Sequence, residues 1–227
     1  MSFLQRVRKF LTAPTTLNRA GERRPTSGPR PEAAAEDLLR DHLRRDPNDP
    51  MAFGALAALV GRRAAASGES DDPLTAESVI DDVERERRSD LAVWALAEEL
   101  AGHPKAWFPL VELARLSLDD DHEGALRRLA TAAERDASGD ALAAGLRLLR
   151  ETGHPAEAFG HGVGHWRVKE HNPESGRQLV LAAIESGRVG EARLHLTSMA
   201  ASDDPRVKRI VEDLTPLLDR SARAGAD

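Results

Sequence analysis

The chain has 227 residues, a formal net charge of −6 and no Cys or Tyr. The absence of Cys excludes disulfide scaffolds, Cys-based zinc sites and thiol catalysis, and it suits a reducing compartment. Only 4% of the residues are aromatic, so Ala, Leu and Val supply most of the core, which favours helices and argues against an all-β fold. The longest apolar run has about ten residues, far short of a membrane-spanning helix.

Residues 1–12 predict a basic amphipathic helix, and residues 13–30, rich in Pro, Gly, Ser and Thr, predict a flexible linker. The first 30 residues are basic, whereas the rest of the chain is acidic. We expect this arm to dock on a partner groove or on an anionic membrane surface. The alternatives are an arm folded back onto the body, an unstructured arm or an organellar transit peptide. The residues expected to dock are Phe3, Leu4, Arg6, Val7, Arg8, Lys9, Phe10 and Leu11.

From residue 31 onward, nearly every segment has helical spacing, and turn signals rich in Gly, Pro, Asp and Asn separate the segments. The segment 151–158 recurs at 185–192, with Glu, Gly, Glu and Ala repeated at a spacing of 34 residues. Such a period is typical of arrays of helical hairpins. The sequence therefore predicts an all-α fold of stacked antiparallel helical hairpins over residues 31–204, closed by a capping helix and a short tail over 205–227.

These features resemble the tetratricopeptide repeat family, whose unit has an aromatic residue and then a small residue in its first helix. A Gly in the turn and an Ala at the start of the second helix complete the pattern. The resemblance implies a right-handed α-solenoid in which the repeated alanines fill equivalent close-packed sites near the starts of second helices. The residues that carry it, and that we expect to pack the repeats, are Phe53, Ala57, Ala92, Trp107, Ala125, Gly153, Ala158, Gly187 and Ala192.

Histidines gather between residues 154 and 171. His161 and His165 are four residues apart on a helix predicted over 155–171, and this spacing places two imidazoles on one helical face, a geometry that zinc accepts. The plainer interpretation is a helix packed closely through the three glycines of 160–164, with His165 in the core or an interface. His171 would then lie at the C-terminus of this helix, a position that histidine favours.

No catalytic constellation is recognisable. The glycines of 160–164 match neither a dinucleotide fingerprint nor a P-loop, and no predicted strand precedes them. The sequence has no Gly-x-Ser-x-Gly nucleophile elbow, and the acidic run 119–121 is more typical of a helix cap than of a cation site. We therefore expect no cofactor and no enzymatic activity.

Stacked hairpins create extended concave surfaces. The resemblance therefore implies a protein–protein interaction module or scaffold that binds a peptide or partner helix on the concave face. The competing hypothesis is a metal-binding protein or enzyme that uses the histidines of 154–171. Nonspecific nucleic-acid contact through the basic arm ranks third, because the acidic body lacks basic–aromatic clusters. We expect a cytoplasmic protein with another protein or peptide as its partner, no specific nucleic acid, and peripheral membrane association through residues 2–12 as an alternative.

Overall fold

In a computed structural model, residues 31–67 and 79–224 are described, and they form ten α-helices with no strand among them. The expected all-α class is therefore confirmed for this part of the chain. The predicted docking helix over 1–12 and the linker over 13–30 lie outside the described residues. No helix in the described ranges combines the length and the apolar character needed to cross a membrane.

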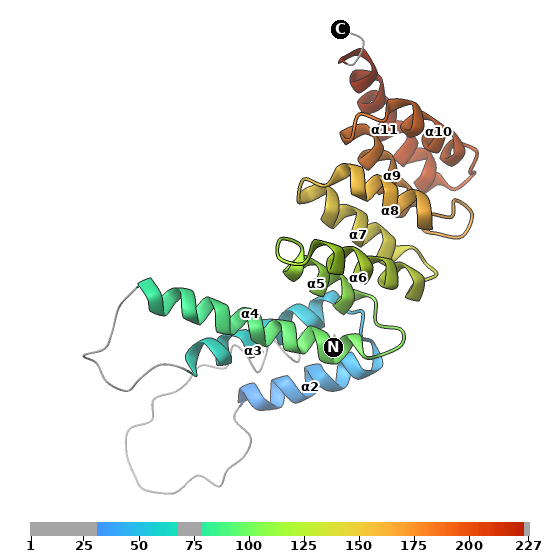
Figure 1. The fold of residues 1–227 in the computed structure, drawn as a ribbon. Helices are drawn as coiled ribbons and strands as arrows, with labels where there is room; N and C mark the ends of the chain where they lie inside the picture. The colour runs from blue at the N-terminus through green and yellow to red at the C-terminus, as the bar shows by residue number, and fades with distance from the viewer. Residues whose placement is uncertain (1–30, 68–78, 225–227) are drawn as a thin grey trace, which may run out of the picture. The chain divides into compact units, whose positions relative to one another are not determined.

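The first of two compact units contains α2 (Pro31–Arg45), α3 (Pro50–Ala66) and α4 (Val79–Ala101), and α3 packs against both of the others (Figure 1). The start of α3 follows from its local sequence. The Asp49 carboxylate caps the helix by accepting hydrogen bonds from the backbone N–H groups of Met51 and Ala52 at 2.9 and 3.0 Å. Pro50 fills the first helical position, where a missing N–H costs nothing.

Two of the repeat-packing residues lie on α3, and they differ in burial. Phe53 is 2% exposed, whereas Ala57 is half-buried. Ala92 is also half-buried, and it lies in the middle of α4, not near the start of a second helix as the repeat predicts. That expectation is wrong because no Gly or Pro interrupts residues 79–101, so the helix continues through the place where the repeat requires a turn.

The second unit begins at Pro104 and contains α5 (Phe108–Ser117), α6 (His122–Arg135), α7 (Asp140–Glu151), α8 (Pro155–His165), α9 (Pro173–Glu185), α10 (Val189–Ala200) and α11 (Pro205–Ala224). Figure 1 shows these helices following one another in chain order. Each packs against the next along the chain, and α5 also contacts α7, α7 contacts α9, and α9 contacts α11. Trp107, the expected aromatic residue of a first helix, is the residue that precedes α5.

The repeated Glu-x-Gly segments give two turns with the same backbone geometry. Gly153 and Gly187 have φ values of 87° and 74°, which an L residue rarely adopts. After α7, the N–H of His154 donates to the Leu149 carbonyl at 2.7 Å, and after α9, the N–H of Arg188 donates to the Ala183 carbonyl at 2.8 Å. Both are Schellman caps, so the sequence repeat produces a structural repeat.

Three of the repeated alanines share one position in their helices. Ala125, Ala158 and Ala192 are each the fourth residue of their helix, in α6, α8 and α10 respectively, and each is 0% exposed. A methyl group at these positions lets the neighbouring helices approach closely, whereas a larger side chain would overfill the space.

The helix that carries the central histidines is shorter than the predicted 155–171. It ends at His165, and Trp166 already has the extended backbone angles φ −70° and ψ 136°. The indole ring of Trp166 packs edge-on against the imidazole of His195, with centroids 5.5 Å apart, and it also lies close to Gly176. We attribute the early end of α8 to this packing, which local spacing does not reveal. His171 consequently lies in the loop before α9 and not at a helix C-terminus.

Candidate functional site

The structure brings His161 and His165 together, as their spacing predicts. Their ring centroids are 4.5 Å apart, and Nδ1 of His165 lies 3.0 Å from the carbonyl oxygen of His161. Burial, together with the neighbouring His165, lowers the pKa of His161 to about 4. The Nε2 atom of His161 is buried without a hydrogen-bond partner among the described residues.

This pair lacks the further ligand that a metal site requires. No third His, Asp or Glu among the described residues joins His161 and His165 in a group with metal-ligand spacing. A structural zinc site uses four protein ligands and a catalytic one uses three. A buried ring nitrogen on His161, whose pKa is lowered, beside a half-buried His165 fits the alternative of a packed helix better than a metal site.

Only one of the three neighbouring glycines makes a close approach. A Cβ atom at Gly162 would lie 2.7 Å from Cδ1 of Leu179 and 3.2 Å from Cδ1 of Leu146, so α8 passes close to both α7 and α9 at this point. At Gly160 and Gly164 nothing lies within 4 Å of such an atom. The expectation that all three glycines pack is therefore wrong, because Gly160 and Gly164 face away from the neighbouring helices.

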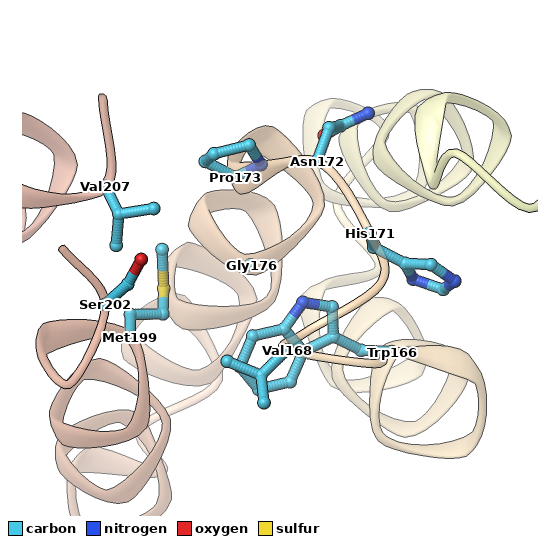
Figure 2. Close-up of a pocket in the computed structure, with 9 residues that line it drawn as sticks. All are labelled: Trp166, Val168, His171, Asn172, Pro173, Gly176, Met199, Ser202 and Val207. Atoms are coloured by element: carbon cyan, nitrogen blue, oxygen red, sulfur yellow. The ribbon is translucent and has the colours of Figure 1, made fainter. Parts of the chain in front are cut away.

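A small cavity of about 30 Å³ lies between the loop after α8, the start of α9 and the end of α10 (Figure 2). Its apolar walls are Trp166, Val168, Pro173, Met199 and Val207, and its polar lining is His171, Asn172 and Ser202. Ligand pockets in proteins generally measure about 300–1,000 Å³. The cavity is therefore far too small for a cofactor or an apolar side chain and has room for about one or two water molecules.

This cavity shares several of its lining residues with a wider groove. The groove is lined by residues of the loops before α7, α9 and α11, among them Ser138, Lys169 and Asp204. His171 borders both spaces, and burial lowers its pKa, although Asp136 and Glu170 act in the opposite direction. A histidine that is neutral at pH 7 can donate or accept one hydrogen bond there but adds no positive charge.

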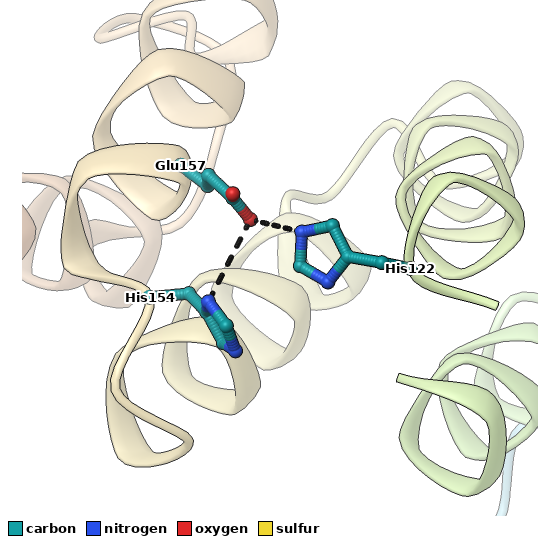
Figure 3. A group of neighbouring side chains, drawn as sticks. All are labelled: His122, His154 and Glu157. Atoms are coloured by element: carbon teal, nitrogen blue, oxygen red, sulfur yellow. Dashed lines mark hydrogen bonds and ion pairs between the residues drawn. The ribbon is translucent and has the colours of Figure 1, made fainter. Parts of the chain in front are cut away.

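A second histidine cluster joins two different hairpins (Figure 3). Nε2 of His122 lies 2.7 Å from Oε2 of Glu157, and Nδ1 of His154 lies 4.0 Å from the same oxygen. Sequence analysis placed only His154 in a candidate group, because His122 and Glu157 are 35 residues apart. This separation is close to the repeat period, so a comparison of residues one repeat apart could have found the cluster.

Charged side chains link α7 to α9 along one face. Arg147 contacts Glu174 at 3.0 Å, Arg150 contacts Glu185 at 2.8 Å, and Arg150 also donates to Gln178. We call these five residues the α7–α9 face. Arg147 and Glu174 are partly exposed, with 51% and 35% of their side chains accessible, so their charges can reach a bound partner.

Comparison of the chain with protein-family models, with curated proteins and with solved structures found no match. The resemblance to the tetratricopeptide repeat family therefore stays a prediction.

Proposed function

We propose that α5–α11 form a right-handed, tetratricopeptide-like stack of helical hairpins, and that this stack is a protein–protein interaction module. Its partner would be a peptide or a helix bound on the concave side. The equivalent Schellman turns at Gly153 and Gly187 support the repeat, as do the buried alanines at the fourth positions of α6, α8 and α10. The step from a stacked fold to binding is an analogy with other helical repeats.

The observation that carries the proposal is the unequal packing of alternate helices. The first helices of the hairpins contact one another in series, from α5 to α7, α9 and α11. The second helices α6 and α8 contact each other only slightly, and α8 and α10 do so even less. In a stack, the side on which neighbouring units lie closer together is the inner side of the curve. This supports a concave surface made by the first helices.

The α7–α9 face is the part of this surface on which we expect a partner to bind. Its ion pair between Arg147 and Glu174 joins two first helices at 3.0 Å. Exposed ion pairs contribute only about 0–1 kcal/mol to stability. Arg147 and Glu174 can therefore give up their mutual ion pair and bind charged groups of a partner instead. The fold loses little stability when they do so.

Selection from a peptide-display library on the purified full chain tests the proposal. We expect it to enrich peptides that bind the wild-type chain and lose at least tenfold in affinity for the double variant Arg147→Ala, Glu174→Ala. This variant leaves the net charge unchanged and removes side chains on which the fold depends little. Fluorescence anisotropy with the selected peptides measures the affinity.

A matched control exists on a second helix. The exposed pair Arg127 and Glu123 on α6 has an N–O distance of 3.6 Å, and replacing both with Ala should leave peptide affinity unchanged. An equal loss of peptide affinity in the two double variants would contradict the proposal that the partner binds on the concave face. Failure to select any peptide that binds above background would argue against the interaction module itself.

A further inference from the structure

The cluster of His122, His154 and Glu157 gathers three metal-ligand side chains from two hairpins. One nitrogen or oxygen atom from each residue lies within 4.8 Å of the others. The two imidazole rings face each other at a tilt of 50°, with centroids 4.9 Å apart. In Figure 3, one carboxylate oxygen of Glu157 is joined to one ring nitrogen of His122 and to one of His154. No other group of three such residues occurs in the described ranges.

Local structure fixes where each of these residues lies. The Asp121 carboxylate accepts the N–H of Gly124 at 2.9 Å and starts α6, so His122 is its first residue. The Schellman turn at Gly153 places His154 directly before α8. Glu157 then follows in the first turn of that helix. All three positions are therefore set by helix starts and not by a mobile segment.

The distances suit a tetrahedral zinc ion. With Zn–N and Zn–O bonds near 2.0–2.2 Å, two ligand atoms of a tetrahedron lie about 3.3 Å apart. The two ligand distances to Glu157, 2.7 Å from His122 and 4.0 Å from His154, lie on either side of that value. Because all three ligand atoms lie within 4.8 Å of one another, changes of up to about 1.5 Å through side-chain rotation would place them around one ion.

The cluster is also accessible to a metal ion. The side chains of His122, His154 and Glu157 are 35%, 35% and 41% exposed. An ion bound there can be reached from solvent and keeps a fourth position for water. Two imidazoles and one carboxylate favour Zn²⁺ over Mg²⁺ and Ca²⁺, which prefer sites built from oxygen alone.

We propose that His122, His154 and Glu157 bind one Zn²⁺ ion, which joins α6 to α8. These two second helices otherwise make few contacts with each other. Both helices begin at the site, and their N-terminal dipoles disfavour a cation. The carboxylates of Glu157 and of the capping residue Asp121 offset this effect. The ion would link adjacent hairpins, independently of whether the first-helix face binds a peptide.

Isothermal titration of the untagged full chain with ZnCl₂, after removal of metals with EDTA, tests the proposal. We expect one ion per chain with micromolar or tighter affinity, and no heat of binding with Mg²⁺ or Ca²⁺. Co²⁺ should give the visible absorption of a tetrahedral site with nitrogen and oxygen ligands. Each of His122→Ala, His154→Ala and Glu157→Gln should weaken Zn²⁺ binding at least tenfold.

The other histidine pair supplies the matched control. His161→Ala and His165→Ala should bind Zn²⁺ as the wild type does. In EDTA, the Glu157→Gln chain should keep the wild-type melting temperature. Its loss of Zn²⁺ binding would then not be caused by unfolding. The proposal is overturned if wild-type chain binds no Zn²⁺, or if binding survives the three cluster substitutions and disappears with those at 161 and 165.

Discussion

At the scale of single residues, His161 makes stability depend on pH. Its pKa is about 4 in the folded chain, below the ordinary value of 6.5. Between these two values the unfolded chain takes up a proton that the folded chain does not. Stability therefore falls as pH decreases from 6.5 to below 4, by about 3 kcal/mol in total. Above pH 6.5 the imidazole is neutral in both states and contributes no pH dependence.

We predict that His161→Leu removes this part of the acid sensitivity. Urea unfolding at pH 7 and at pH 4.5 should show a smaller loss of stability in the variant than in the wild type. The exposed, non-titrating Val163 on the same helix, replaced with Leu, serves as the control and should behave as the wild type does. A variant as acid-sensitive as the wild type would show that burial does not lower the pKa of His161.

Single residues also show which structural features can be predicted from the sequence. Gly153 and Gly187 were predicted as turn residues because a helix C-cap with positive φ is a local requirement. The contact of His161 with His165 was predictable for the same reason, because the two residues are one helical turn apart. The approach of His122 to Glu157 depends instead on how two hairpins stack. Local spacing carries no information about such a contact.

At the scale of the helix, α8 carries two glycines in opposite situations. Gly160→Ala should stabilise the chain by about 0.5–1 kcal/mol, because Ala restricts the unfolded chain and nothing lies within 4 Å of the added methyl group. At Gly162 the methyl group would lie 2.7 Å from Leu179, which is fully buried and cannot move freely. Overfilling a core destabilises a protein by about 1–3 kcal/mol. This loss exceeds the stability that replacing Gly with Ala gains from the higher helix propensity of Ala.

We therefore predict opposite signs for the two substitutions on one helix. Chemical denaturation of the two variants under the same conditions measures the difference. Gly164→Ala, also at an open position, should behave as Gly160→Ala does. If Gly162→Ala were as stable as Gly160→Ala, α8 would not approach α7 and α9 as closely as the structure indicates.

Helix boundaries were predicted where the sequence contains a cap or a breaker, and missed where it does not. Pro155, Pro173 and Pro205 each begin a helix, as their position after a turn signal indicates. The end of α8 was placed six residues too late, at 171 in place of 165, because the residue that ends it, Trp166, is neither Gly nor Pro. The turn expected before Ala92 is absent, because neither Gly nor Pro lies within Val79–Ala101 to end α4 there.

At the scale of the whole molecule, α11 ends the second unit and covers its last hairpin. The helix packs against both α9 and α10. Val207, Leu214 and Leu218 are buried, and Val207 also borders the cavity beside Met199. The helix expected to cap the stack therefore buries three apolar side chains, whereas its charged residues are exposed or half-buried. Pro216 lies inside α11, so it does not start a new helix.

Removal of α11 should expose the apolar surfaces that α9 and α10 bury against it. A chain that ends at Ser202 loses three buried apolar side chains of α11, each worth roughly 1.5–3 kcal/mol when fully buried. We expect it to bind a hydrophobic dye, to unfold at lower urea concentration and to enter the pellet on centrifugation. A chain that ends at Ala224 keeps the whole helix and is the control, so it should resemble the full-length protein in all three measurements. If the chain ending at Ser202 were as stable as the control and bound no more dye, α11 would not act as the cap of this unit. Its buried leucines would then contribute little to the stability of the hairpins before it.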